Sequence, residues 1–395
     1  MGPTGELPLS VTEVCSTYAS HEWRPCVETL TPWPWVSTER RRVGNVLCDV
    51  YRPDGTPDRN CPRQLLKMQL DALREQHSLA IKTAFEYEFF AFKKNTLEPL
   101  GSDRLQFCDL RVWGDHQELM SELRETLEAM GVRNVTIQAE FPPGQWELTT
   151  NPCEGVTGAD VGFYVKNAVK GFLRARGYDA TFMTRPTLES IGSGLHLNHS
   201  LWRLRPTGEE GAENVLLGGD SDKLSPTAKH WIAGLLTHAA ALTALMCPTL
   251  NCYRRLHNLV SPSSSTWGLD DRNALVRARV LGSNVFLENR LPSAAASPYL
   301  AIAATVAAGR DGLERRLECP RPTDKSVSSE VPRTLAQALT ALEEDHQLAT
   351  LLGENFVDYY VKAKRELEVS PYDKADLKTD GEQIEFERNM YFRTY

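Results

Sequence analysis

One strand-like segment, IKTAFEYEFFAF at residues 81–92, constrains the fold more than any other part of the sequence. Side chains alternate between the two faces of a strand, so Glu86 and Glu88 point to one face while Phe85, Tyr87 and Phe89 point to the other. The two neighbouring carboxylates repel each other unless a cation lies between them. On its own, such a pair is more typical of a solvated sheet edge than of a metal site. The rest of the sequence has to discriminate between these two readings.

Four further segments have strand-like patterns, and long helical segments lie between them. The strands are expected at 135–140, 179–185, 194–201 and 283–290. Helices are expected over 61–76, over 115–130 with a stop at Gly131, and from Ser225 and Pro226 onward through WIAGLLTHAAALTALM. Because the pattern has few short βαβ repeats, it predicts an α+β domain.

The first 60 residues have a different character from the rest of the chain. Residues 1–42 are rich in Pro, Trp, Ser and Arg without sustained periodicity, which predicts an irregular arm that packs Trp33 and Trp35 on the main body. VGNVLCDVY at 43–51 alternates like a strand and ends at a turn. We therefore expect an N-terminal arm with a remnant strand over 1–60 and one main domain over 61–395.

Composition excludes several classes of protein. The net charge of −8 comes without a basic stripe, which disfavours nucleic acid as a partner. Nine cysteines, scattered and without a CxxC pair, favour a reducing, cytoplasmic compartment. The first residues lack the features of a leader peptide, and no run of about 18 apolar residues occurs, so no membrane is expected as a partner.

Two further motifs supply a context for the paired carboxylates. EFPPGQWE at 140–147 places one glutamate at the end of a strand and another after a Pro-Pro-Gly turn, and GSGLHLNHS at 192–200 leads a glycine-rich turn into a strand carrying His196. The order, spacing and wording of these motifs resemble the glutamine synthetase superfamily, class I type. The resemblance continues through NCYRRL at 251–256, TWGLDDRNALVR at 266–277, the stretch 286–313 and LGENFVDYYVKAKRELE at 352–368, and so spans 43–395.

The resemblance implies a fold and a set of site residues. The fold would be the glutamine synthetase catalytic domain, with a curved antiparallel sheet and flanking helices. The implied ligands of Mg²⁺ or Mn²⁺ are Glu86, Glu88, Glu140, Glu147, His196 and Glu288. The implied catalytic residues are Arg255, Arg272 and Arg290, with Gly192, Arg255 and Arg290 at the amino-acid substrate and Ser200, Arg272 and Arg277 at the nucleotide.

These residue types suit the implied chemistry, in which ATP phosphorylates a glutamate carboxylate and an amine displaces the phosphate. Oxygen-rich sites suit hard divalent cations, which neutralise charge on a transferred phosphoryl group. Guanidinium groups bind carboxylate and phosphate through a rigid fork. For an isolated arginine, a surface or interface ion pair is the commoner explanation. His199 is expected to be a packed or surface histidine, and Trp146 and Trp202 are expected to be core or rim aromatic residues.

The sequence also departs from the family pattern. No DGSS-like stretch occurs in residues 1–42, so the N-terminal β-grasp domain and its ammonium-binding aspartate are expected to be largely missing. Ser261 stands where ammonia-using members carry a flap glutamate, and Ile191, Asn198 and Ser283 replace an asparagine, a histidine and a lysine. Because both ammonium-binding anions are absent, we expect an amine acceptor larger than ammonia.

A resemblance to lengsin, a lens protein of this superfamily regarded as non-enzymatic, keeps a second function open. It is carried by ATVAAGRDGL at 304–313 and by the tail at 338–368. The first hypothesis is an ATP- and metal-dependent carboxylate–amine ligase, with ATP and glutamate as substrates. The alternative is a structural or scaffold protein, for which a cytoskeletal partner is open. We expect a homo-oligomer, and the family resemblance implies that its subunits form a ring.

Overall fold

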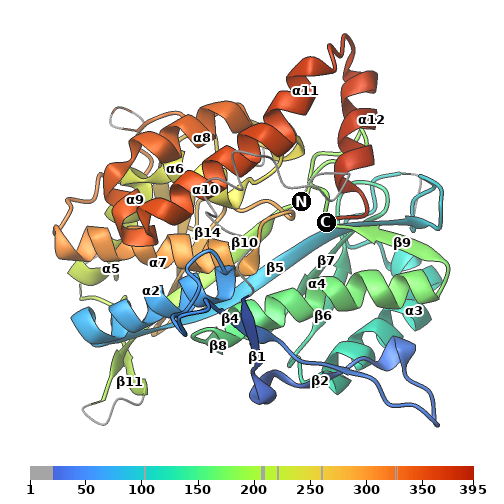
Figure 1. Cartoon of the computed structure of the whole chain (residues 1–395), viewed down its shortest axis with the longest axis horizontal. Helices are drawn as coiled ribbons and strands as arrows, with labels where there is room; N and C mark the ends of the chain where they lie inside the picture. The colour runs from blue at the N-terminus through green and yellow to red at the C-terminus, as the bar shows by residue number, and fades with distance from the viewer. Residues whose placement is uncertain are drawn as a thin grey trace.

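The computed structural model describes residues 21–395 apart from 102–103, 206–209, 220–221, 259–260, 325 and 327. Figure 1 shows the long strand β5 (Leu79–Lys93) crossing the middle of the molecule, with α3 and α4 near one end and the group α5 to α10 gathered near the other. The predicted combination of a sheet with flanking helices is confirmed.

A ten-stranded sheet forms the scaffold of the described part of the chain. Its main path runs β12-β13-β14-β10-β5-β7-β6, with β8 and β9 pairing with β5 and β11 pairing with β10. The strands that follow β5 are β6 (Thr136–Ala139), β7 (Gln145–Thr149), β8 (Cys153–Glu154), β9 (Tyr178–Thr181), β10 (Leu195–Leu204), β11 (Glu210–Asn214), β12 (Trp267–Leu269), β13 (Val276–Leu281) and β14 (Asn284–Asn289). The expectation of an antiparallel sheet needs one correction, because β12 pairs with β13 in parallel. The sheet is therefore mixed.

The helices cover this sheet and pack against one another. Their bounds are α2 (Pro62–His77), α3 (Leu110–Ala129), α4 (Thr157–Ala175), α5 (Pro226–Thr237), α6 (Ala239–Met246), α7 (Pro298–Glu314), α8 (Leu335–Glu344), α9 (His346–Leu352), α10 (Glu354–Lys364), α11 (Ser370–Lys374) and α12 (Asp380–Tyr391). As predicted, Ser225 caps α5 by accepting a hydrogen bond from the backbone of Ala228, and Gly131 takes a left-handed φ of 88° just after α3. The long helix predicted after Ser225 is interrupted at His238.

His238 is the physical reason for that interruption. Its Nε2 lies 3.0 Å from Oδ2 of Asp311, and its Nδ1 lies 2.6 Å from Oδ2 of Asp345. His238 is 2% exposed, so the buried carboxylate of Asp311 and the partly buried carboxylate of Asp345 fix its ring between α5 and α6. A tertiary contact therefore interrupts a segment whose local sequence favours one continuous helix.

The described residues ahead of α2 are more ordered than the predicted irregular arm. β1 (Glu22–Pro25) pairs with β4 (Cys48–Tyr51), and β2 (Thr31–Pro32) pairs with β3 (Gly44–Asn45). Trp33 and Trp35 pack on the core as predicted, with their ring centroids 5.0 Å apart. These two small ribbons fall far short of a β-grasp domain. The proposed boundary between residues 60 and 61 stays a prediction, and Cys15 and the first residues lie outside the described residues.

One continuous apolar core joins the sheet to the helices. It includes Phe85, Tyr87 and Phe89 from the aromatic face of β5, each no more than 1% exposed, as the alternation predicted. Trp146 is also fully buried, and His199 is buried against Trp231, whose Nε1 donates to His199 Nε2 at 3.0 Å. No helix among the described residues has both the length and the apolar character needed to cross a membrane.

Candidate functional site

Strand register brings the predicted acidic residues to one face of the sheet. In β5, Glu86 lies opposite His196 of β10 and Glu88 lies opposite Glu147 of β7. β14 then places Glu288 opposite Asn198 on β10. Because alternate residues of a strand share a face, these side chains converge although they come from four strands.

Glu86, His196 and Glu288 form the tightest cluster. One ligand atom from each lies within 4.8 Å of the others. The Nδ1 atom of His196 lies 3.0 Å from Oε2 of Glu86 and 3.5 Å from Oε1 of Glu288. Two carboxylates and one imidazole nitrogen suit a hard divalent cation such as Mg²⁺ or Mn²⁺, so the residues present fit the implied metal.

Glu288 and Glu86 are held in place by specific partners. Glu288 is 1% exposed and accepts from Arg277 Nη1 at 2.9 Å and from Arg290 Nη1. Asn198 Nδ2 donates to Glu86 Oε1 at 3.0 Å. Burial opposes the ionisation of Glu86, but its bonds to His196 and Asn198 outweigh that effect and lower its pKa to about 2. Asn198, which departs from the family pattern, thus orients a candidate metal ligand.

Glu88, Glu140 and Glu147 form a second, more open acidic group. Gln138 Nε2 donates to Oε1 of Glu140 at 3.0 Å and to Oε1 of Glu147 at 3.2 Å. Gln145 Nε2 donates to Glu88 Oε2 at 3.1 Å. Within the described chain these three do not reach the close spacing of the first cluster. The side-chain amides of Gln138 and Gln145 therefore orient the three carboxylates.

In this second acidic group, the pKa values of Glu140 and Glu147 are raised. Burial and the nearby charge of Glu88 raise the pKa of Glu140 to about 7. The same two causes raise the pKa of Glu147 to about 9. Such raised pKa values mean that the surrounding protein does not offset the negative charge of these carboxyl groups. A divalent cation among them would reverse the effect, so this group also fits a metal.

Acidic residues and arginines line one pocket of about 400 Å³. The lining includes Glu86, Glu88, Glu140, Glu147 and His196 together with Arg255, Arg272, Arg277, Arg279 and Arg290. All three predicted catalytic arginines and the predicted substrate residue Gly192 are therefore in this pocket. A cavity with both kinds of lining suits a metal together with an anionic, phosphorylated ligand.

Arg255 lies deepest among the arginines. It is 3% exposed, and its Nη2 donates to His196 Nε2 at 3.0 Å and to the carbonyl of Arg290 at 3.1 Å. The glycine turn before β10 makes room for it: Gly192 has a φ of 95°, and a Cβ on Gly194 would lie 2.9 Å from Arg255 Nη2. Burial lowers the pKa of Arg255, a cost that an anionic ligand would offset.

The predicted nucleotide residues have different surroundings. Arg277 lines the pocket but is bound to Asp270 and Glu288. Ser200 is on the same face of β10 as His196, but its Oγ accepts from Trp202 Nε1 at 2.9 Å and it does not line the pocket. Its assignment to the nucleotide stays a prediction. Trp202 packs under the ammonium group of Lys82, 4.3 Å from the ring centroid.

Sequence reasoning missed several residues of the pocket, among them Arg279 and the four residues that follow. Gln138 and Gln145 hold the acidic group, and Phe107 and Phe141 stack at the rim with ring centroids 4.4 Å apart and an interplanar angle of 8°. Gln138 lies two residues before Glu140, so strand alternation could have placed it on the same face. Phe107 lies far from Phe141 in the sequence, and no local pattern pairs them.

Comparison with known proteins shows the family of the chain. The family model described as "Glutamine synthetase, catalytic domain" matches residues 59–387. Human lengsin is 33% identical over 94% of this chain and 70% of its own length, and the glutamine synthetase of Thermus thermophilus is 32% identical over 90% and 81%. A solved structure described as "GmaS/ADP complex" aligns with a TM-score of 0.81 and 30% identity, covering 93% of this chain and 84% of the other.

The fold is a mixed sheet with flanking helices, and the site is a pocket lined by acidic residues and arginines. The chain belongs to the glutamine synthetase family. Its relatives include both glutamine synthetases and lengsins, so family membership alone does not assign its activity.

Proposed function

We propose that this protein is an ATP- and divalent-metal-dependent carboxylate–amine ligase whose acceptor is an amine larger than ammonia. The observation that carries the proposal is the pocket in which five arginines face four glutamates and His196. A phosphoryl transfer needs both groups at once, because the transferred group is anionic and the cations that accompany it need anionic ligands.

The acidic residues and the arginines of the pocket have different roles in that reaction. Divalent cations held by Glu86, His196 and Glu288 and by Glu88, Glu140 and Glu147 would supply neutralisation of the phosphate charge. Arg255, buried beside Gly192, would bind the carboxylate of the amino acid. Arg272 and Arg290 would contact the phosphoryl group, for which a guanidinium fork is well shaped.

The reaction has two steps, phosphorylation of the carboxylate and displacement of the phosphate by the amine. A γ-carboxylate oxygen of glutamate attacks the γ-phosphorus of ATP, and the bond to the β-phosphate oxygen breaks to release ADP. The amine nitrogen then attacks the acyl carbon and loses a proton, and the bond between that carbon and the phosphate oxygen breaks. Inorganic phosphate leaves with the former carboxylate oxygen, and a γ-glutamyl amide remains.

The rim of the pocket supports an amine with a carbon skeleton. Ser261 lines the pocket where ammonia-using members carry a glutamate, so it offers no negative charge to an ammonium ion. Phe107, Phe141 and Ile191 also line it and are 47%, 46% and 38% exposed. Apolar side chains at a polar pocket favour an alkyl or aryl group over a small hydrated cation.

A non-enzymatic role is the second candidate, and the similarity to human lengsin over 94% of the chain is the observation that favours it. In that role the pocket would be inherited without turnover, and a protein partner would be the functional ligand. The clustered carboxyl groups of Glu140 and Glu147, whose pKa values are raised, lower the stability of the metal-free protein, so their presence favours retained metal binding.

We also propose that the chain forms a homo-oligomer, with a ring as the expected arrangement. The N-terminal ribbons expose Trp23, Val27 and Leu30, which are 71%, 73% and 63% exposed. Exposed apolar side chains clustered in one segment suit a contact with another subunit. Sedimentation velocity at micromolar concentrations should show an assembly, whereas a monomer at every concentration would contradict this proposal.

A turnover assay tests the ligase proposal. Purified protein is supplied with ATP, Mg²⁺, glutamate and, in parallel reactions, ammonium, methylamine, ethylamine, isopropylamine or benzylamine, and phosphate release is measured. Amine-dependent release that favours an alkyl or aryl amine over ammonium is the expected result. Efficient glutamine formation from ammonium would refute the amine assignment, and failure to bind ATP at millimolar Mg²⁺ would favour the scaffold role.

A further inference from the structure

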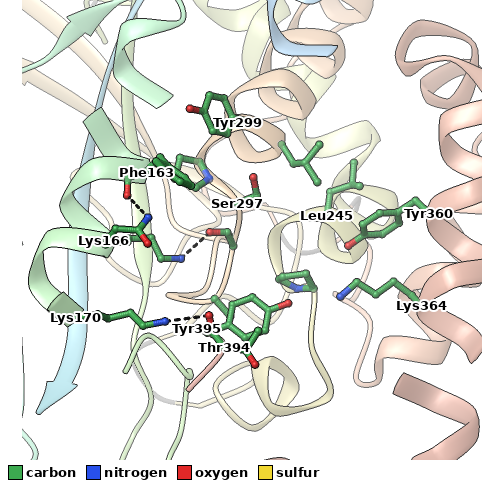
Figure 2. Close-up of a pocket in the computed structure, with 16 residues that line it drawn as sticks. Phe163, Lys166, Lys170, Leu245, Ser297, Tyr299, Tyr360, Lys364, Thr394 and Tyr395 are labelled. Atoms are coloured by element: carbon green, nitrogen blue, oxygen red, sulfur yellow. Dashed lines mark hydrogen bonds between the residues drawn. The ribbon is translucent and has the colours of Figure 1, made fainter. Parts of the chain in front are cut away.

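A second cavity, separate from the catalytic pocket, lies between α4, α10 and the C-terminal residues. It measures about 310 Å³, and none of its lining residues lines the catalytic pocket. Figure 2 shows Lys166 and Lys170 pointing into it from α4 and Lys364 pointing into it from α10 on the opposite side. Among its described lining residues there are three lysines and no acidic side chain.

Lys166 and Lys170 are partly buried, and their ammonium groups form no ion pair with a described carboxylate. Lys166 Nζ donates to the carbonyls of Ala294 and Ala296 at 2.8 and 3.0 Å, and Lys170 Nζ donates to the carbonyls of Arg393 and Thr394 at 3.0 Å each. Carbonyl groups offer partial charges only. The cavity thus holds two partly buried ammonium groups whose printed partners are all neutral carbonyl oxygens.

Lys364 provides an internal comparison on the facing wall. Its ammonium group pairs with Glu368, which also accepts from Tyr391 Oη at 2.7 Å. Burial opposes the charge of Lys364, but Glu368 raises its pKa well above the usual value. Burial and the neighbouring Lys170 instead lower the pKa of Lys166 to about 7, and burial lowers the pKa of Lys170. The uncompensated positive charge of the cavity thus lies on α4.

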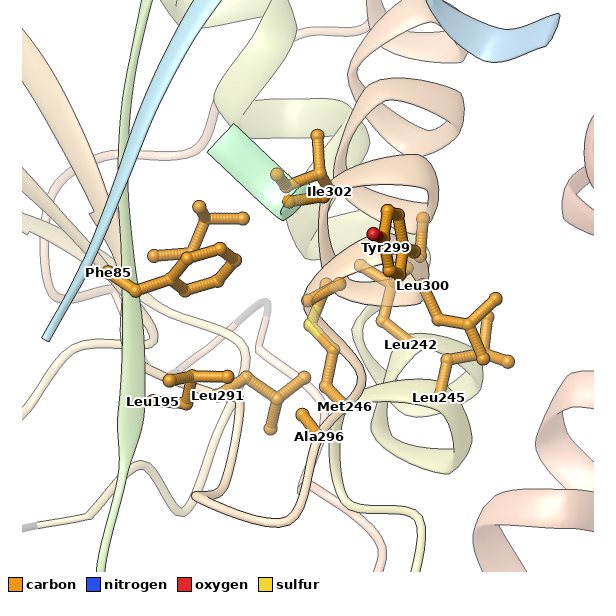
Figure 3. Packing of buried hydrophobic residues seen from close by; sticks show 14 of the residues in the cluster. Phe85, Leu195, Leu242, Leu245, Met246, Leu291, Ala296, Tyr299, Leu300 and Ile302 are labelled. Atoms are coloured by element: carbon orange, nitrogen blue, oxygen red, sulfur yellow. The ribbon is translucent and has the colours of Figure 1, made fainter. Parts of the chain in front are cut away.

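Much of the remaining lining is apolar. Phe163, Leu245, Pro248 and Leu300 contribute apolar surface, and Tyr360 is turned so that its hydroxyl donates to the carbonyl of Ala244 at 2.8 Å. Figure 3 shows Leu245 and Leu300 within the buried cluster between α6 and α7, which fixes this wall. The cavity therefore has a cationic side and a preformed apolar side.

We propose that this cavity binds a small organic anion, with its carboxylate or phosphate head between Lys166 and Lys170 and an apolar body of about one ring against Leu245 and Pro248. A compact anionic head would supply the counter-charge that the protein does not, and lysine ammonium groups bind such heads as point charges. The volume lies near the lower end of the range of about 300–1,000 Å³ for small-molecule sites, which limits the ligand to one ring or a short branched chain.

Calorimetric titration of the full chain with phenyl phosphate, benzoate, inorganic phosphate and benzyl alcohol tests the proposal. Phenyl phosphate or benzoate should bind saturably at one site, and the preferred one identifies the head group. Each should bind at least about tenfold more tightly than benzyl alcohol, which lacks the charge. Inorganic phosphate should bind more weakly than phenyl phosphate because it lacks the apolar body. Equal binding of benzyl alcohol, or no saturable binding, would overturn the proposal.

Variants assign the binding to this cavity. Lys170→Met should weaken binding of the better probe about tenfold or more, whereas Lys170→Arg should retain it. Lys362→Met, on the exposed face of α10, and Arg272→Gln, in the catalytic pocket, should leave binding unchanged. Loss in Arg272→Gln with retention in Lys170→Met would place the anion in the catalytic pocket and overturn the assignment. Thermal melting confirms that each variant is folded. The comparison of the four probes uses the natural protein, so it tests the proposal even if a variant does not fold.

Discussion

Nη2 of Arg255 lies 3.0 Å from Nε2 of His196, on the far side of the imidazole from Glu86. A guanidinium group is always a donor, so Nε2 of His196 accepts this bond and Nδ1 carries the ring proton toward Glu86. A metal bound at Nδ1 would require that proton to move to Nε2, where it would face another donor. The position of Arg255 and metal binding at His196 therefore oppose each other.

This opposition gives the first prediction, that Arg255→Gln binds Mn²⁺ more tightly than the natural protein in the absence of substrates. Removing a cation so close to the cluster should strengthen binding roughly fivefold, which corresponds to about 1 kcal/mol of screened repulsion. The same variant should lose affinity for glutamate. Titration followed by electron paramagnetic resonance measures free Mn²⁺, and Arg272→Gln, which changes an exposed arginine of the same pocket, is the control. Weaker Mn²⁺ binding in Arg255→Gln would contradict the account.

The second prediction concerns Glu147, whose carboxyl lies near Glu88 and Glu140. Glu147→Gln keeps the shape of the side chain and is neutral in both the folded and the unfolded state, so it removes the cost of the raised pKa of Glu147, and at neutral pH the metal-free variant should be more stable than the natural protein by about 1 kcal/mol or more. Added Mg²⁺ should stabilise the natural protein and have much less effect on the variant. Thermal melts with and without Mg²⁺ measure both effects. Equal stabilisation of the two proteins by Mg²⁺ would exclude Glu147 as a ligand.

The third prediction uses Glu140, whose carboxyl lies in the same acidic group. Glu140→Gln should lower turnover by about 100-fold or more, because it removes a charge from the metal-binding side of the pocket. Chromatography and melting should show an intact fold. Glu385→Gln, on α12 and outside the pocket, is a control of the same chemistry that should retain turnover. Near-normal turnover in Glu140→Gln would separate Glu140 from the reaction.

The fourth prediction concerns the choice of amine. Ser261→Glu places a carboxylate in the pocket where ammonia-using relatives have one, so it should raise kcat/KM for ammonium relative to ethylamine. A single anionic group near a cationic substrate supports a change of roughly tenfold in that ratio. Ser261→Gln is the uncharged control of similar size. An equal shift in both variants would mean that size, and not charge, sets the preference.

The fifth prediction concerns the close packing of α5 on α7. A Cβ on Gly312 would lie 2.1 Å from the carbonyl oxygen of His230, whereas a Cβ on Gly114 in α3 meets nothing within 4 Å. Gly312→Ala should therefore destabilise the protein by about 2 kcal/mol or more despite the higher helix propensity of alanine. Gly114→Ala should be neutral or stabilise it by up to about 1 kcal/mol. Denaturant unfolding compares them, and similar effects at the two positions would contradict the packing argument.

The parts of this structure that follow local patterns were predictable. Alternation placed Glu86 and Glu88 on one face of β5 and its aromatic residues in the core, and Ser225 and Gly131 marked helix ends. The motifs placed Glu140, Glu147, His196 and Arg255 in one pocket because the family resemblance carries long-range information that alternation alone does not.

Other features depend on contacts between distant residues. The interruption at His238 requires Asp311 and Asp345, and the parallel pairing of β12 with β13 has no local signal. The cavity between α4 and α10 brings Lys166 and Lys364 together across about half of the chain. Each arises from tertiary packing, which no sequence window of a helix or a strand contains.

Transfer of labelled oxygen from glutamate to phosphate distinguishes a carboxylate–amine ligase from other ATP-consuming proteins. Glutamate labelled with ¹⁸O in its γ-carboxylate is incubated with ATP, Mg²⁺ and the preferred amine, and the released phosphate is analysed by mass spectrometry. If the protein is such a ligase, each phosphate released carries one oxygen from the carboxylate, and omission of the amine or of glutamate stops the release of phosphate. Unlabelled phosphate, produced by attack of water on ATP, or no phosphate from any amine would contradict the account.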